Sequence, residues 1–149
     1  MKTLWFSLLA GLILNVSTTA QLTKPPLEGV PVEASSFGKD WRILLQIANR
    51  TFSYGNDEEK VTVSVQILKE YPDAAAAKSG YEADARRYGG PKEKTPLGDS
   101  GTDLELVTDT LQERYLVVGR FFMKISQKAG EKDFRNTFAD AYRPVLEAL

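Results

Sequence analysis

The regular alternation in residues 61–67 constrains the fold more than any other feature of the chain. Every second residue in this stretch is Val or Ile, and the residues between them are Thr, Ser and Gln. Because successive side chains of a strand point to opposite faces, this pattern predicts a strand with one dry face and one wet face. The dry face of such a sheet has to be covered by other elements of the fold.

Three further stretches are predicted to be strands. Residues 41–54 read as one long strand, in which Trp41, Ile43, Leu45 and Ile47 share a face. The apolar positions then change parity at residues 52 and 54, which predicts a bulge near residues 49–50. Residues 102–109 form a shorter candidate, and residues 114–127 form a long one that is apolar on both faces.

One predicted helix follows the strand at residues 61–67, and a second follows the strand at residues 114–127. Pro72 or Asp73 marks the start of a helix that extends to about residue 88, with small residues along its apolar stripe. Asp133 starts the last helix, and Pro144 inside it is expected to kink or shorten the final turn. The residues expected in the core are Val63, Val65, Phe121, Phe134 and Phe138.

The order strand, strand, helix therefore occurs twice. It predicts an α+β fold, with an antiparallel sheet of about four strands in ββαββα order and two helices packed on one face. Residues 41–149 are expected to form this single domain. Residues 21–40, rich in Pro, Gly and Ser, are expected to form an N-terminal arm that either lies over the body, using Leu27, Val30, Val32 and Phe37, or is partly disordered.

Residues 1–20 have the pattern of a secretory signal peptide. Lys2 precedes an uncharged apolar run at residues 4–14, and small residues then lead to Ala20, after which we expect cleavage. The run is about half of the ~20 apolar residues that span a bilayer. We therefore expect a secreted or periplasmic protein with no stable membrane anchor after cleavage.

Charge and cysteine content narrow the possible partners. The chain has 19 Lys and Arg against 20 Asp and Glu, and loss of Lys2 takes the net charge from −1 to −2. Nucleic-acid binding is not expected, because it needs a basic face. The chain has no cysteine, hence no disulfide and no lipid-modified cysteine, so stability has to come from the hydrophobic core.

No sequence feature predicts a catalytic or metal site. Residues 98–101 (Gly-Asp-Ser-Gly) match part of the nucleophile loop of chymotrypsin-like proteases, but the chain has no histidine to activate Ser100. Residues 56–59 and 99–103 offer oxygen atoms without the spacing of a calcium loop. We expect no cofactor, no metal and no catalytic residue.

Five apolar residues of the long strands are left over once the helix-covered face is assigned: Leu44, Phe52, Leu116, Val118 and Phe122. Three readings of this set stay open. The arm or a curled sheet covers it, a second copy or a protein partner docks on it, or it lines a ligand pocket.

The pattern of elements over residues 40–149 resembles small bacterial exported domains of ββαββα order and unassigned function. The shared features are a Gly-Asp segment before the third strand and a long strand of the type seen at residues 115–125. The resemblance implies a fold and an exported location, and no mechanism. We therefore expect an exported, non-enzymatic binding or protein-interaction module. Two alternatives are a small hydrolase using carboxylate, Ser or Lys chemistry, and a structural component of the cell envelope.

Overall fold

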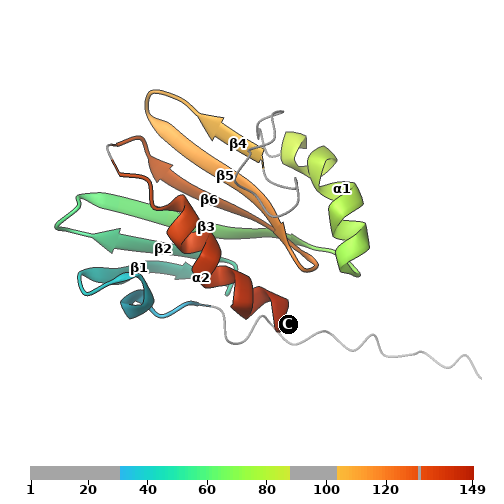
Figure 1. Ribbon diagram of the computed structural model, residues 1–149, viewed down its shortest axis with the longest axis horizontal. Helices are drawn as coiled ribbons and strands as arrows, with labels where there is room; N and C mark the ends of the chain where they lie inside the picture. The colour runs from blue at the N-terminus through green and yellow to red at the C-terminus, as the bar shows by residue number, and fades with distance from the viewer. Residues whose placement is uncertain (1–30, 88–103, 131) are drawn as a thin grey trace, which may run out of the picture.

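The computed structural model describes residues 31–87, 104–130 and 132–149, and it contains one antiparallel sheet with helices on both faces (Figure 1). The sheet has six strands in the order β1-β2-β3-β6-β5-β4, so β1 and β4 are its two edges. The elements are η1 (Ala34–Phe37), β1 (Trp41–Ile47), β2 (Thr51–Asn56), β3 (Val61–Glu70), α1 (Ala74–Arg87), β4 (Leu104–Val107), β5 (Leu111–Val118), β6 (Phe121–Lys128) and α2 (Arg135–Glu147).

The α+β class and the antiparallel sheet are confirmed, but the prediction of about four strands in ββαββα order is wrong. Each of the two long predicted strands is a hairpin. Between β1 and β2, Ala48 and Asn49 have φ values of 49° and 52°, so the chain reverses where a bulge was expected. Two successive residues with positive φ are what a tight hairpin turn requires, and Asn tolerates that conformation.

The second hairpin, between β5 and β6, turns at Gly119 and Arg120. Gly119 has a φ of 56°, which suits glycine at the first loop position of a two-residue hairpin. Residues 114–127 show no clean alternation because both faces of β5 and β6 are buried. Gly119 was therefore the one mark of a turn in this stretch, and without alternation around it the two strands were predicted as one.

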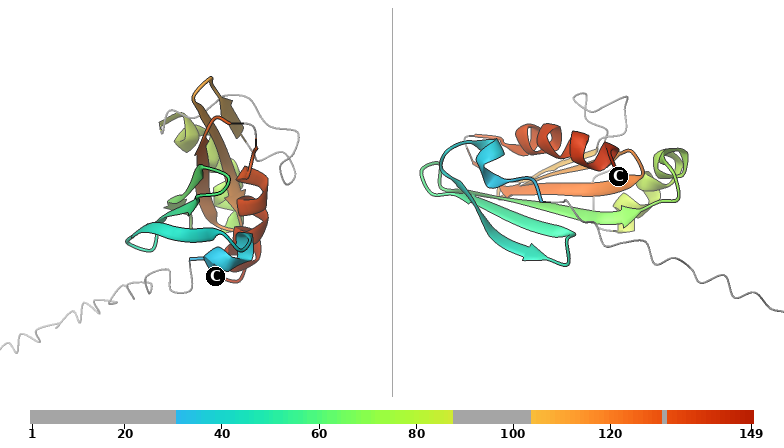
Figure 2. Two further views of the ribbon diagram at one scale, coloured as in Figure 1. Left: turned by 90° about the vertical axis from the view of Figure 1, so that its left-hand side faces the viewer. Right: turned by 90° about the horizontal axis from the view of Figure 1, so that it is seen from below.

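The two helices lie on opposite faces of the sheet, so the prediction that both pack on one face is also wrong. Leu116 and Val118 of β5 are buried in one cluster with α2, whereas Tyr115 and Val117 are buried in a second cluster with α1. Because neighbouring residues of a strand face opposite ways, the two helices cover opposite sides of β5. Figure 2 shows α2 lying along one face of the sheet. We call the face without α2 the far face.

The α2 side holds the larger core. Val63, Val65, Phe121 and Phe138 are fully buried as expected, and Phe134 is partly buried at its margin. The ring of Phe138 is the centre of an aromatic cluster with Phe37, Trp41 and Tyr54. In the arm, Val32 is buried and Phe37 packs against this core, while Leu27 and Val30 lie outside the described residues.

Two buried hydroxyl groups fasten the arm to this core. The hydroxyl of Tyr54 donates to the carbonyl of Val32 at 2.9 Å and lies 2.6 Å from the hydroxyl of Tyr142. Burial raises the pKa of both tyrosines, so they stay neutral at physiological pH. The last helix meanwhile continues beyond Pro144 to Glu147.

On the far face, α1 packs closely against the sheet. The side chain of Asp73 accepts the amide of Ala76 at 2.8 Å, which confirms it as a cap. A Cβ atom at Gly80 would lie 2.9 Å from the ring of Tyr71, so glycine permits the close approach at this point. Tyr71 and Lys69 both donate to Asp84, at 2.5 and 2.7 Å, and join the end of β3 to the helix.

Candidate interaction surface at the edge strand β1

The five residues predicted as an interaction face do not form one surface. Phe52, Leu116 and Val118 are buried in the α2-side core, and Phe122 is buried in the α1-side core. Only Leu44 is exposed, with 47% of its surface accessible. The two helices cover the other four, and the two sheet faces separate Phe122 from the rest.

The exposed apolar residues are concentrated instead on β1, the edge strand. Ile43, Leu44, Leu45 and Ile47 are 38%, 47%, 48% and 52% exposed. The sequence placed Trp41, Ile43, Leu45 and Ile47 on one buried face, but only Trp41 is buried. Ile43, Leu45 and Ile47 are therefore surface residues that the alternation in the sequence did not reveal.

An irregularity in β1 explains the difference. The pairing with β2 shifts between Ile43 and Leu45, which leaves Leu44 as an extra residue. Ile43 pairs with buried Tyr54 on the α2 side, whereas Leu45 pairs with Ser53 on the far face. Beyond the bulge every side chain has therefore changed face.

Leu44, Leu45 and Ile47 consequently share the far face, and we call these three residues the β1 strip. Leu44 lies over Gly55 of β2, since a Cβ atom at Gly55 would meet the Leu44 side chain at 2.7 Å. Ile47 pairs with Thr51, which has the same parity in β2 as Gly55. The bulge thus gathers three large apolar side chains on one side of the sheet edge.

The floor beside the β1 strip is made of small polar residues. Ser53 of β2 and Ser64 of β3 pair directly, and their hydroxyls lie 2.9 Å apart. Thr51 and Thr62 occupy neighbouring far-face positions on the same strands. Contacts of α1 with the sheet are concentrated on β5 and β6, so among the described residues no helix packs closely on this end of the far face.

The two edges of the sheet differ: β4 carries two features that discourage strand pairing, whereas β1 carries a bulge and exposes large apolar side chains. β4 is only four residues long, and Glu105 in its centre points inward to the guanidinium of Arg135 at 2.5 Å. Short length and an inward charge are devices by which proteins prevent unwanted strand pairing. β1 has seven residues, and its one charged residue, Arg42, is held by Asp57 of the neighbouring turn at 2.9 Å.

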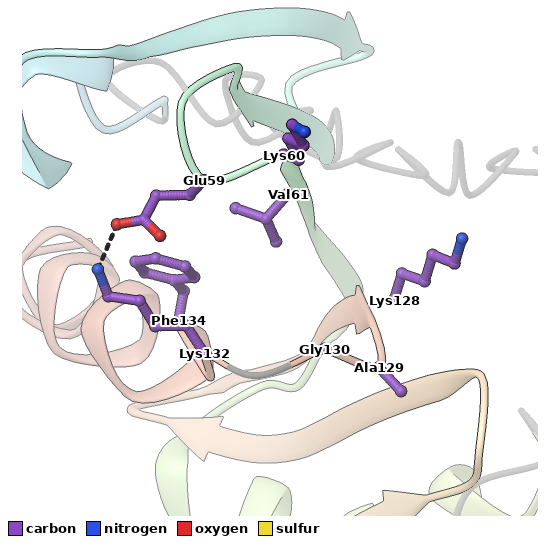
Figure 3. Close-up of a pocket in the computed structure, with 8 residues that line it drawn as sticks. All are labelled: Glu59, Lys60, Val61, Lys128, Ala129, Gly130, Lys132 and Phe134. Carbon is purple, nitrogen blue, oxygen red and sulfur yellow. Dashed lines mark hydrogen bonds and ion pairs between the residues drawn. The ribbon is translucent and has the colours of Figure 1, made fainter.

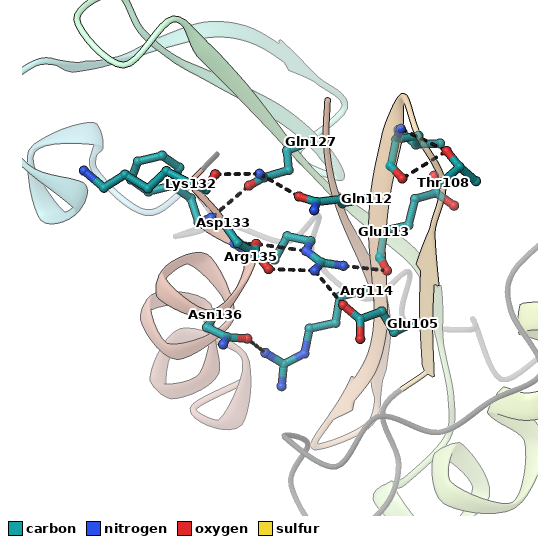
Figure 4. Close-up of polar contacts among 12 residues, drawn as sticks. Glu105, Thr108, Gln112, Glu113, Arg114, Gln127, Lys132, Asp133, Arg135 and Asn136 are labelled. Carbon is teal, nitrogen blue, oxygen red and sulfur yellow. Dashed lines mark hydrogen bonds and ion pairs between the residues drawn. The ribbon is translucent and has the colours of Figure 1, made fainter. Parts of the chain in front are cut away.

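The network around Arg135 shows how the β4 edge is fixed (Figure 4). Arg135 donates to Asp133 at 2.6 Å and to the carbonyl of Glu113 at 3.1 Å, and Arg114 donates to Asn136. Burial would raise the pKa of Asp133, but the bonds from Arg135 outweigh it and hold that pKa below its ordinary value. Each group has partners, so the network joins α2 to β4 and β5 and offers no open binding site.

A cavity of about 530 Å³ lies between the β2–β3 turn and the start of α2 (Figure 3). Its wall contains Val61 and Phe134, and its rim carries lysines. The amine of Lys132 is paired with Glu59, and Lys128 extends away from Phe134 in Figure 3. The lysine amines therefore do not converge on one point, as recognition of an anionic ligand would require.

Two of the remaining chemical candidates from the sequence lie outside the described residues. These are the nucleophile-like residues 98–101, including Ser100, and the second oxygen-rich loop. In the first loop, Asn56 accepts the amide of Glu59 at 3.0 Å, a bond that closes a turn. No group of three or more potential metal-ligating side chains occurs within residues 31–87, 104–130 and 132–149.

Comparisons with known proteins do not extend this picture. No protein-family model, no curated protein and no solved structure matches the chain. Among the helices of the described residues, none is long and apolar enough to cross a membrane.

Proposed function

We propose that this chain is an exported protein-interaction module whose partner docks on the edge strand β1. The observation that carries the proposal is the contrast between the two sheet edges. β4 has four residues and an inward-pointing Glu105, whereas β1 has seven residues and exposes four large apolar side chains. An exposed apolar edge strand is a template for another strand, so it is expected to be covered when the protein works.

The expected energy of docking agrees with a modest but specific interaction. Complete burial of a large apolar side chain contributes about 1.5–3 kcal/mol. Ile43, Leu44, Leu45 and Ile47 are about half exposed, so covering them contributes about 3–6 kcal/mol from this side of the interface. Strand pairing adds backbone hydrogen bonds, each with a net contribution of about 0.5–1.5 kcal/mol.

Export is the second part of the proposal, and it rests on the signal-peptide pattern of residues 1–20. The mass of the exported protein tests it. We expect a chain that begins at Gln21, and an exported chain that still begins at Met1 contradicts it.

Site-specific photo-crosslinking tests the docking surface. A photoreactive amino acid replaces Leu45 on β1 or, as the matched control, Val107 on β4, which is 58% exposed. The protein is irradiated in cells or in the fluid that contains the exported protein, and the adducts are identified by mass spectrometry. Position 45 is expected to give one defined adduct and position 107 none. Equal labelling at both positions, or none at position 45, contradicts the proposal.

A further inference from the structure

We infer that the partner of β1 is a second copy of the same chain, paired antiparallel through β1 to give one continuous sheet across a two-fold axis. This inference rests on the proposed function and names the partner of that surface. It is carried by the register that β1 allows when it is paired with itself.

Side-chain facing restricts the possible registers. In a continuous antiparallel sheet, directly opposed residues have to lie on the same face. Along β1, Ile43 and Gln46 lie on the α2 side because they pair with Tyr54 and Phe52. Arg42 pairs with Gly55 and therefore lies on the far face together with the β1 strip.

One register satisfies this rule over the length of the strand. It places Leu44 opposite Leu45 of the second copy, Ile43 opposite Gln46, and Arg42 opposite Ile47. The two-fold axis then passes between Leu44 and Leu45. Sliding one copy by a single residue opposes Ile43 to Leu45, which lie on different faces. The bulge thus makes β1 complementary to its own copy, which is the requirement of a two-fold interface.

The same register gathers apolar surface and avoids charge repulsion. Leu44 and Leu45 of both copies meet around the axis, with one Ile47 at each end. The two Arg42 side chains are kept apart, because each lies opposite Ile47 of the other copy. Each guanidinium also retains Asp57 of its own chain. A strip with so little charge is typical of homodimer interfaces, which are more apolar than transient ones.

Pairing with a second copy also increases the apolar surface that is buried on association. Association has to offset a substantial loss of translational and rotational freedom. Self-pairing buries the apolar side chains of both strands, so it doubles the apolar contribution of β1. The net charge of −2 expected for each cleaved chain produces little repulsion between copies.

Sedimentation equilibrium of residues 21–149 over a wide concentration range tests the inference. We expect a reversible dimer in the wild type, a dimer dissociation constant at least about 100-fold higher in Leu45→Lys, and no change in Val107→Lys. Circular dichroism and urea unfolding confirm that both variants are folded. A wild type that stays monomeric, or a Leu45→Lys variant that dimerises normally, overturns the inference.

Engineered cysteines test the register, because the natural chain contains none. Ile43→Cys combined with Gln46→Cys places opposed thiols across the axis, and mild oxidation is expected to give a covalent dimer. Arg42→Cys combined with Gln46→Cys, whose side chains lie on opposite faces, is the matched control and is expected to stay largely unlinked. Linkage that is equal in the two variants contradicts the register.

The outcomes separate the two proposals. Photo-crosslinking at position 45 to a different protein, with a monomeric purified chain, overturns the second-copy inference and leaves the interaction module standing. No adduct at position 45 together with a monomeric chain overturns both.

Discussion

Replacing Phe138 by Ala tests the aromatic centre of the α2-side core. The side chain is fully buried, and its ring lies 3.8 Å from that of Phe37 and 5.1 Å from those of Trp41 and Tyr54. Truncation of a buried Phe to Ala costs about 3–5 kcal/mol, the sum of lost transfer energy and the cavity left behind. Each aromatic pair contributes about 0.5–1.5 kcal/mol more than its buried area implies.

Because three such pairs are lost together, we expect a loss in the upper part of the range for Phe-to-Ala truncation, about 4–5 kcal/mol in the free energy of unfolding. With an m-value of about 1–3 kcal/mol/M in urea, the midpoint falls by more than about 1 M. The measurement is urea unfolding followed by fluorescence and circular dichroism, at one protein concentration. Val107→Ala, on an exposed residue, is the control and is expected to change stability by less than about 0.5 kcal/mol. A loss below about 1 kcal/mol for Phe138→Ala would refute the packing of α2 on this core.

Three further predictions concern single contacts. Gly80→Ala improves helix propensity by about 1 kcal/mol, but its Cβ meets the Tyr71 ring at 2.9 Å, so the melting temperature is expected to fall; a rise contradicts the close packing. The hydrogen bond from Lys69 lowers the pKa of the Asp84 carboxyl group from its ordinary value of 3.8. The contribution of this ion pair to the free energy of unfolding is therefore present at pH values above 3.8 and is lost as the pH falls below that value. In urea unfolding, Asp84→Asn should therefore be less stable than wild type near pH 7, with a smaller difference near pH 3; a difference independent of pH contradicts the ion pair. Tyr142→Phe breaks the 2.6 Å hydroxyl pair and is expected to cost about 0.5–1.5 kcal/mol in thermal unfolding, and no change would show that the pair adds no stability.

The elements with one wet face were predictable from the sequence, and those buried on both faces were not. The strand that begins at Val61 alternates cleanly and was found, and so were both helices, α1 with its cap at Asp73. β5 and β6 were merged into one strand because the two helices bury opposite faces of them and remove the alternation. The change of parity before β2 was visible, but a bulge and a tight turn both produce such a change.

The candidate surface was predictable only in part, for a related reason. Leu44 was among the residues predicted for this surface and is exposed, but the bulge at this residue has no glycine or proline to mark it in the sequence. Without that bulge, Leu45 and Ile47 continue the alternation of Trp41 and are assigned to the core. The bulge therefore places Leu45 and Ile47 in the β1 strip, and the same bulge makes this placement unpredictable from the alternation in the sequence.

Measuring how accessible β1 is to a chemical label in the working protein tests most directly whether that strand is an interface. Since the chain has no cysteine, Leu45→Cys and Val107→Cys each introduce a single thiol, whose rate of maleimide labelling is read by mass spectrometry in the fluid or compartment where the exported protein accumulates. Rates on the urea-unfolded variants correct for intrinsic reactivity. With β1 covered, the thiol of Leu45→Cys reacts at least about tenfold more slowly than that of Val107→Cys. Equal corrected rates at the two edges would mean that β1 stays open to solvent and is not an interface.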